Sequence, residues 1–557
     1  MPPTASNRVL YSRFLLLIAG LGGLLYGIDV GIIAAALLYL SKTIDLTVQQ
    51  TSAIVAAVLG GGMISSLVAG FLADLFGRKR MMLFSGLMFV LSVGIIVLSQ
   101  SFVALLLGRL LQGMSGGIIA VVVPLYLAEC LSARHRGRGT AIFQFMLTFG
   151  IVAAALTGLF YTQQAEAAIA AAAGNAQLIR AAQNHAWRGM FLSVIYPGIL
   201  FFLGSILLSE TPRWLVRKGR IEAARAALLR SVAPEEAETE LNEMQTLAAQ
   251  NRNEKASGSL LKRKYVVPFL LACAVLSLNQ TTGINSVLGY LVIILKQAGM
   301  TASHAAQGDV AVKVLNCVMT IVAIVLVDRK GRKFLLALGT AGIVIALVTG
   351  GLVFRGFESE RRNVAAQVQA AVRGNALQFP VTDNMFVSSP SGPDRRPMSL
   401  AVLYTTGSGE KIATALSNDP VPVLSIPHDS SARGPLVIRR AQYGPVPSEA
   451  TGWMVTVLLG LFIASYAAGP GVVVWLMLSE LMPTRIRAMG MGIALLLNQG
   501  ISTLIADLFL PVVGNYGYFA MFFFWAACTC LYLLIAVFLI PETKGRSLEE
   551  IEMHFAR

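Results

Sequence analysis

Twelve apolar runs dominate this sequence, and each is long enough to cross a lipid bilayer as a helix, which takes about 20 residues. A helix pairs its backbone polar groups internally, so it is the natural form for such runs in lipid. The sequence therefore predicts an all-α membrane protein with twelve transmembrane helices. They cover residues 13–40, 51–75, 81–100, 102–128, 139–162, 187–209, 265–296, 309–328, 333–354, 451–479, 487–511 and 517–540.

The composition agrees with a membrane protein of many spans. Hydrophobic residues make up 55% of the chain and charged residues only 13%, against about 25% charged residues in soluble domains. The net charge of +15 does not indicate a nucleic-acid partner, because the basic residues are gathered in short segments between the apolar runs. That pattern orients proteins in membranes.

The basic segments predict the orientation of the chain. Clusters at residues 78–80, 134–138 and 329–333 follow the second, fourth and eighth runs, whereas the alternate short segments have almost no Lys or Arg. Under the positive-inside rule, the basic segments and both termini face the cytoplasm. The first run is of span length and lacks the cleavage site of a signal peptide. We therefore expect a multi-pass protein of the plasma (inner) membrane.

The two halves of the chain repeat one another. Parallel six-helix repeats are typical of two-lobed transporters that rock about a central site. Three motifs recur at matching places: Asp74-Leu-Phe-Gly-Arg-Lys as Asp328-Arg-Lys-Gly-Arg-Lys, Glu129 as Glu480, and Glu210-Thr as Glu542-Thr.

This repeat predicts the organisation of the chain. The segment between the halves is charged and amphipathic, which predicts short helices at 221–229 and 235–247. The insert between the ninth and tenth runs has Pro and Gly punctuation, which fits either a small, partly ordered subdomain or a flexible loop. We expect an N-terminal six-helix lobe (1–210), a cytoplasmic helical linker (211–264), a C-terminal six-helix lobe (265–356 and 450–540), an extracytoplasmic insert (357–449) and a cytoplasmic tail (541–557).

A polar stretch interrupts the seventh run, at Asn279-Gln280-Thr-Thr-Gly283-Ile-Asn285. Polar groups are costly against lipid, so these must face protein or a water-filled cavity. Gly283 allows local unwinding of the helix. Carboxamides donate and accept hydrogen bonds, as recognition of a neutral sugar or polyol requires, but Asn and Gln also bond helix to helix. The stretch alone leaves both interpretations open.

The sequence shows no nucleophile–base set, metal-ligand cluster or phosphate-binding loop. We therefore expect that the protein is not an enzyme and has no catalytic residue, metal or cofactor. Without a nucleotide site, transport has to draw on an ion gradient, such as a proton gradient, or on the gradient of the substrate itself.

Six motifs are spaced in register along the chain: Gly70-x-x-x-Asp74-x-x-Gly77-Arg78-Lys79, Pro124-Leu-Tyr126-Leu-Ala-Glu129, Glu210-Thr-Pro212-Arg213-Trp214-Leu215, Gln280-x-x-Gly283-Ile284-Asn285, Asp328-x-x-Gly331-Arg332 and Pro541-Glu542-Thr543-Lys544-Gly545-Arg546. With these motifs the chain resembles the sugar-porter family of the major facilitator superfamily, which includes bacterial xylose– and glucose–proton symporters and facilitative glucose transporters. The resemblance implies the major facilitator fold of two six-helix lobes and transport of a monosaccharide.

The resemblance also implies which positions contact the sugar. Asn279 stands where the family has a longer glutamine, Gln499 replaces a tryptophan, and Gly289 stands where a tyrosine is frequent. These departures predict a pocket that is less aromatic and roomier. The implied substrate-binding residues are Tyr26, Gln144, Asn279, Gln280, Asn285, Trp475, Asn498 and Gln499.

Asp29 lies inside the first run, where an ionisable residue marks a functional site and is expected to have a partner. Arg109, inside the fourth run, is the candidate. A carboxyl that exchanges this partner for a proton as the lobes rock would couple proton entry to sugar entry; a static buried ion pair is the alternative. The resemblance favours coupling, since proton-linked sugar porters carry Asp here. A second intramembrane acid, Asp507, is expected at a watery external vestibule.

Acidic and basic residues recur in the cytoplasmic segments, in a pattern too regular for a solvated surface. Charge pairs that bridge the lobes would favour the outward-open state and would break for inward opening. Orientation by positive charge alone is the alternative, and it leaves the paired acids unexplained. We expect a cytoplasmic gate formed by Asp74, Arg78, Glu129, Arg136, Glu210, Arg213, Asp328, Arg332, Glu480, Arg485, Arg487 and Glu542.

The sequence thus predicts a secondary active transporter, namely a proton-coupled symporter of a hexose or pentose that works by alternating access. Its partners would be the monosaccharide, the proton and the lipid bilayer, and we expect a monomer. One alternative is a facilitative uniporter for a sugar or a polyol such as inositol. Another is a transporter-like sugar sensor in which the insert 357–449 binds a partner.

Overall fold

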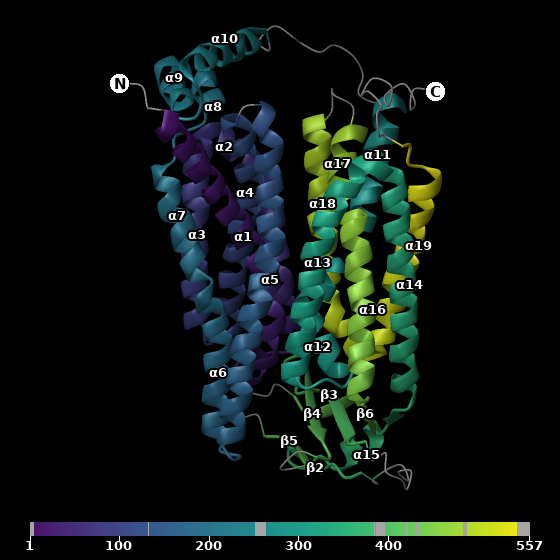
Figure 1. Ribbon diagram of the computed structural model, residues 1–557. Coiled ribbons are helices and arrows are strands. Elements are labelled where there is room, and N and C mark those ends of the chain that lie inside the picture. The colour runs from purple at the N-terminus through teal and green to yellow at the C-terminus, as the bar shows by residue number, and fades with distance from the viewer. Residues whose placement is uncertain are drawn as a thin grey trace.

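The computed structural model describes residues 5–131, 133–250, 263–383, 385, 396–418, 422–428, 434–482 and 487–542. Twelve of the helical segments described there are long and apolar enough to cross a membrane, which confirms the predicted number of spans. They form two lobes that stand side by side, with both chain termini at one end and the β-strands at the other (Figure 1). We call these the termini end and the insert end.

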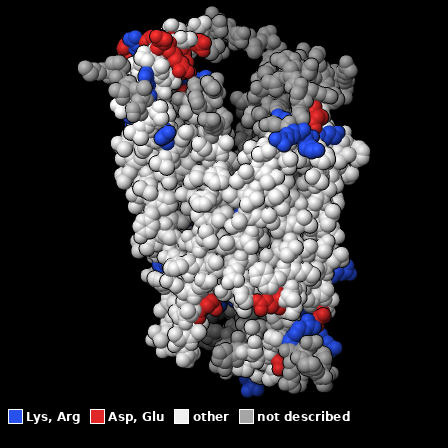
Figure 2. Space-filling model, in the orientation of Figure 1, with Lys and Arg blue, Asp and Glu red and all other residues white. Residues whose placement is uncertain are grey.

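The surface has the charge distribution of a membrane protein. Charged side chains gather toward the two ends, and the middle of the visible face is almost free of them (Figure 2). A bilayer solvates such an apolar band, whereas charged residues favour the aqueous and headgroup regions on either side.

The described part of the N-terminal lobe and the linker contains helices joined by short loops, and no strand. The α6 and α7 helices together make one span. The lobe consists of α1 (Ala5–Thr43), α2 (Val48–Phe76), α3 (Arg78–Leu98), α4 (Phe102–Cys130), α5 (Ala133–Ala171), α6 (Ala176–Ser193) and α7 (Ile195–Leu207), and the linker holds α8 (Pro212–Arg217), α9 (Ile221–Leu229) and α10 (Pro234–Gln250).

The C-terminal lobe has the same number of spans, two of which are broken. The α11 and α12 helices form one span, and α17 continues α16. The lobe consists of α11 (Arg263–Thr281), α12 (Ile284–Gln297), α13 (Ala302–Lys330), α14 (Arg332–Ser359), α16 (Glu449–Ala468), α17 (Pro470–Leu481), α18 (Arg487–Tyr516) and α19 (Tyr518–Phe538).

The break between α11 and α12 lies in the polar stretch, as predicted. Gly283 has a φ of 85°, a left-handed conformation that a side chain rarely adopts. A Cβ there would lie 2.3 Å from the Trp525 ring, so only glycine lets α19 pack against the break. The α16–α17 break falls at Gly469-Pro470, where proline lacks the backbone N–H that would continue the ladder.

The predicted linker helices are present. The α9 helix has the predicted bounds, and α10 is longer than predicted at both ends. The Ala-rich segment at residues 163–186, in contrast, lengthens α5 and α6 beyond the predicted spans. Its helices are tied to α1 near the insert end, where Tyr39 donates to Glu166 (2.8 Å) and the Trp187 indole donates to Thr43 (2.9 Å).

The described part of the insert is folded and has a core of its own. A four-stranded antiparallel sheet has the order β1-β6-β3-β4, and β2 and β5 form a second pair. Leu400, Val402 and Tyr443 are buried between the strands and the short helix. The elements are β1 (Arg362–Asn363), α15 (Ala365–Ala370), β2 (Leu377–Pro380), β3 (Met398–Thr405), β4 (Glu410–Leu416), β5 (Val423–Ile426) and β6 (Val437–Pro445).

Candidate transport site

The first part of the site is a buried ion pair within the N-terminal lobe. Asp29 on α1 lies 3.3 Å from the Arg109 guanidinium on α4, and both side chains are 1% exposed. Arg109 also donates to Gln112 (2.8 Å) and lies over the Phe191 ring. The Oδ2 atom of Asp29 has no hydrogen-bond partner among the described residues. The structure therefore brings together the two residues expected to couple proton movement, and it leaves one carboxylate oxygen unengaged.

Glycines position the Asp29 segment. A Cβ at Gly27 would lie 1.9 Å from the Leu147 carbonyl oxygen, and a Cβ at Gly31 would lie 2.8 Å from the Ala154 Cβ. Small residues let helix backbones approach closely in membranes. The α1 helix is thus packed tightly on α5 along one face, which leaves Asp29 directed toward Arg109 on α4.

The second part of the site is a chain of amides in the C-terminal lobe. Asn285 on α12 donates to Gln280 on α11 (2.9 Å) and to Ser502 on α18 (2.7 Å). Gln280 in turn donates to Asn498 on α18 (3.2 Å). The helix break at Gly283 is what brings Gln280 and Asn285 to one another. Three of the predicted substrate-binding residues are therefore joined in one uncharged network.

Two aromatic residues contact amides that neighbour this network in the sequence. Asn279 donates to the Tyr466 hydroxyl on α16 (3.1 Å), and Tyr26 on α1 interacts with Gln499 on α18. The second contact joins the two lobes. Tyr26 thus contacts an amide of the other lobe and lies three residues before Asp29 on the same helix.

Two of the predicted sugar contacts are not tied to this network. Gln144 on α5 is half-buried, and Trp475 on α17 is 43% exposed. Neither side chain makes a hydrogen bond to another described residue, so their role in sugar binding stays a prediction.

Gly289 lies at a contact between the lobes. A Cβ at Gly289 would lie 3.2 Å from Val55 on α2 of the other lobe, so the missing side chain lets the lobes approach. The roomier pocket expected from this position stays a prediction.

The lobes touch one another in the middle and toward the insert end. Gln49 on α2 donates to Asp507 on α18 (2.9 Å), which places Asp507 at the contact between lobes near the insert end. Thr148 on α5 contacts Cys317 on α13 (3.6 Å). The described residues thus bring the two lobes into contact toward the insert end.

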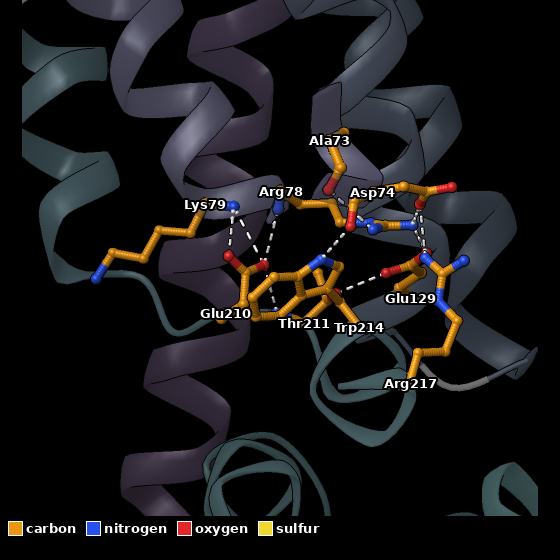
Figure 3. Close-up of polar contacts among 9 residues, drawn as sticks. All are labelled: Ala73, Asp74, Arg78, Lys79, Glu129, Glu210, Thr211, Trp214 and Arg217. Carbon is orange, nitrogen blue, oxygen red and sulfur yellow. Dashed lines mark hydrogen bonds and ion pairs between the residues drawn. The ribbon is translucent and has the colours of Figure 1, made fainter. Parts of the chain in front are cut away.

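A charge cluster lies at the termini end of the N-terminal lobe (Figure 3). The Arg78 guanidinium lies 2.7 Å from Asp74 and 2.8 Å from Glu129. Arg217 on α8 also pairs with Asp74 (2.6 Å), and Trp214 donates to the Asp74 carbonyl (2.9 Å). The described pairs hold α2, α3, α4 and the linker together within one lobe. They do not bridge the lobes in this conformation.

Glu210 caps a helix in the same cluster (Figure 3). Its carboxylate accepts hydrogen bonds from the backbone N–H groups of Arg78 (3.0 Å) and Lys79 (3.2 Å), at the first turn of α3. Burial raises the pKa of the Glu210 carboxyl above its ordinary value, and these backbone donors oppose that shift. A Cβ at Gly77, whose φ is 101°, would lie 2.3 Å from the same carboxylate.

The cap recurs in the other lobe. Glu542 accepts from the backbone N–H groups of Arg332 (3.0 Å) and Lys333 (3.2 Å), after Gly331 with a φ of 91°. Arg213 is exposed on α8, and Arg217 on that helix pairs with Asp74 instead. The remaining predicted gate residues lie outside the described side chains: Arg136, Asp328, Glu480, Arg485 and Arg487.

Comparison with known proteins identifies the family. The family described as "Sugar (and other) transporter" matches residues 15–373 and 437–555, which is most of the chain. The chain belongs to the sugar porter family of the major facilitator superfamily. It is a membrane transporter and not an enzyme, as predicted.

Several named transporters are similar to this porter in sequence or in fold. It is 27% identical to the glucose transporter GlcP of Staphylococcus epidermidis, over 97% of each chain. It is 28% identical to the probable inositol transporter 2 of Arabidopsis thaliana, over 97% of this chain and 90% of the relative. The xylose transporter XylE from E. coli, in a partially occluded inward open conformation, has the same fold, with a TM-score of 0.66, 20% identity, and coverage of 96% and 99%.

One buried ion pair of the porter was not predicted from the sequence. Lys313 on α13 lies 2.8 Å from Asp309 on the same helix, with side chains 0% and 2% exposed. The Lys313 ammonium also donates to the Gly31 carbonyl on α1 (3.1 Å). Charged residues inside an apolar run were the available signal, but Asp309 stands at the edge of the predicted eighth span.

Proposed function

We propose that this sugar porter is a proton-coupled symporter of a neutral monosaccharide and works by alternating access. The observation that carries the proposal is the buried pair of Asp29 and Arg109. An intramembrane carboxylate is costly unless it is paired, so such residues mark ion pathways. Asp29 holds Arg109 through one oxygen and keeps the other unengaged, which suits a group that alternates between an arginine and a proton.

The amide network supports a neutral, hydroxyl-rich substrate. Gln280, Asn285 and Asn498 offer both donors and acceptors and carry no charge. The relatives named for glucose and inositol are named for solutes of this kind. In the proposal, the hydroxyl groups of a bound hexose or pentose form hydrogen bonds with these amides, in place of the amide–amide hydrogen bonds that the structure shows. The full set of sugar contacts proposed is Tyr26, Gln144, Asn279, Gln280, Asn285, Trp475, Asn498 and Gln499.

The proposal includes an orientation in the membrane. The termini end faces the cytoplasm of the cell whose plasma (inner) membrane holds the porter, because the basic segments lie there. The structure then corresponds to a state closed to the outside, and the predicted gate residues pair across the lobes only when the cytoplasmic side closes. The porter acts as a monomer, since each lobe pair contains one complete set of site residues.

The test is uptake by purified porter in liposomes with an imposed pH gradient, for a panel of pentoses, hexoses and inositols. Asp29→Asn should abolish accumulation against a gradient while it preserves exchange of labelled for unlabelled sugar. The matched control is Asp45→Asn, which removes a carboxylate from an exposed loop and should keep accumulation. Equal accumulation by Asp29→Asn and the parent protein would refute proton coupling through Asp29.

The second candidate function is facilitative transport of a polyol such as inositol, which the inositol transporter relative favours. The same assay separates the two functions. A uniporter brings the substrate only to equal concentrations on both sides, and dissipation of the pH gradient leaves its uptake unchanged.

A further inference from the structure

The buried pair of Asp309 and Lys313 lies where the two lobes meet. Lys313 belongs to α13 of the C-terminal lobe, and its ammonium donates to the Gly31 carbonyl of α1 in the N-terminal lobe (3.1 Å). Asp309 lies one helical turn before Lys313 and accepts from the same ammonium (2.8 Å). The bond to Gly31 is therefore a direct tie between the lobes, made by a cation that is fully buried.

We propose that Lys313 is a positioning residue of the transport cycle, which ties α1 to α13 when the insert end is closed, and that Asp309 holds its ammonium in place for this bond. The proposal rests on the alternating-access transport proposed above, but not on the identity of the coupling ion.

The burial of the pair argues that the tie contributes to the closed state. A lysine inside a membrane protein costs free energy unless its charge is compensated and its donors are used. Asp309 compensates the charge, and Gly31 uses a second donor of the ammonium. When the insert end opens, α13 leaves α1 and Lys313 loses the Gly31 acceptor, whereas Asp309 moves with Lys313 because both are on one helix.

The packing around Gly31 makes the tie specific. The Gly31 backbone lies so close to α5 that a Cβ would be 2.8 Å from the Ala154 Cβ, and α13 contacts α5 one turn further along, at Cys317 and Thr148. Three helices therefore converge at this point. Gly31 is also two residues beyond Asp29, so the tie holds the segment of α1 that carries the proposed proton site.

The test measures the distance between spin labels at the insert end of each lobe. Ser41→Cys on α1 and Asn515→Cys on α18 are suitable positions because both residues are exposed, in a background where Cys528 and Cys530 are replaced by serine. Lys313→Met should increase the ratio of molecules with a long label–label distance to molecules with a short one by about tenfold. This is the change expected for loss of one charge-assisted hydrogen bond. Lys313→Arg, which keeps a cationic donor, should restore most of the short distances.

Two control variants distinguish a specific effect of the Lys313 bond between the lobes from general damage to the structure. Lys296→Met removes an exposed lysine of α12 and should leave the distances unchanged. The double variant Asp309→Asn with Lys313→Met removes both charges, so no uncompensated charge stays buried, and it should still favour the long distances. Parental distances in the double variant, or in Lys313→Met alone, would overturn the proposal. The distances are measured without substrate, so failure of sugar uptake would count against the proposed function and leave this test intact.

Discussion

Arg109 lies closer to Gln112 than to Asp29: its guanidinium nitrogen is 2.8 Å from the Gln112 oxygen and 3.3 Å from the Asp29 carboxylate. Gln112 lies one turn after Arg109 on α4, so this contact does not depend on the position of α1. The arginine is thus shared between a fixed neutral acceptor and a carboxylate. Such sharing weakens the interaction of Arg109 with Asp29. It therefore favours a state in which a proton replaces Arg109 on the Asp29 carboxylate.

The first prediction follows from this sharing. Gln112→Leu removes the competing acceptor, so Arg109 should engage Asp29 alone and oppose its protonation. Half-maximal proton-driven uptake should then require a solution more acidic by about one pH unit, for a change in interaction free energy of about 1.4 kcal/mol. The measurement is initial uptake in liposomes over a range of external pH.

Gln183→Leu is the matched control for this prediction, because Gln183 is a buried glutamine of the same lobe on α6. Its pH profile should coincide with that of the parent protein. An unchanged profile for Gln112→Leu would mean that Gln112 does not influence the exchange at Asp29.

The second prediction concerns the amide network. Asn285→Ala removes the donor to Gln280 and Ser502 and, in the proposal, a sugar contact. KM for the transported sugar should rise by about tenfold, since a hydrogen bond to a neutral partner contributes roughly 1 kcal/mol and more than one is lost. Asn515→Ala, at an exposed amide near the insert end, should leave KM unchanged.

The melting temperature of Asn285→Ala distinguishes the two roles that the sequence left open for this stretch. A lower melting temperature with the parental KM would show that Asn285 only bonds helix to helix. A higher KM is expected only if Asn285 binds substrate.

Much of the architecture could be predicted from the sequence because the bilayer imposes strong rules. Span length predicted twelve helices, and the cost of a lone charge in lipid predicted that Asp29 and Arg109 would meet. The conformational freedom of Gly283 predicted the break that brings Gln280 to Asn285. Each of these inferences depends on one residue and its surroundings in lipid.

Contacts that depend on the approach of distant helices could not be predicted in this way. Lys313 bonds to a backbone carbonyl, that of Gly31, and a carbonyl has no signature in the sequence. At Gly289, an added Cβ would come within 3.2 Å of Val55 on α2 of the other lobe, an approach that the sequence does not show. For the insert, the sequence left a small subdomain and a flexible loop open and did not predict the sheets, because β1 pairs with β6 and β2 with β5 across long stretches of chain.

The third prediction tests the glutamate caps. A Cβ at Gly77 would meet the Glu210 carboxylate at 2.3 Å, and the φ of 101° disfavours any side chain. Gly77→Ala should therefore destabilise the porter by about 2 kcal/mol, from backbone strain and displacement of the cap of α3. The measurement is thermal unfolding of the detergent-solubilised protein.

Gly70→Ala provides the matched control, because Gly70 lies in α2, the helix that ends directly before Gly77, and a Cβ there would meet nothing within 4 Å. Its melting temperature should equal or exceed that of the parent, since alanine favours helix more than glycine does. Equal melting of Gly77→Ala and Gly70→Ala would show that the cap of α3 tolerates a side chain.

The fourth prediction addresses the insert, which contacts both lobes. Lys411 on β4 pairs with Asp45 of the N-terminal lobe (2.6 Å), and Arg440 on β6 donates to Gly514 of the C-terminal lobe (2.9 Å). The Asp45 side chain is 77% exposed, and exposed pairs contribute only about 0–1 kcal/mol. Replacement of residues 362–445 by a short Gly-Ser linker should therefore leave sugar uptake within about threefold of the parental rate, because the site residues all lie in the lobes.

Lys411→Ala, which removes only the pair, should change uptake less. Loss of uptake in the linker variant, with normal yield and melting, would make the insert a working part of the transport cycle.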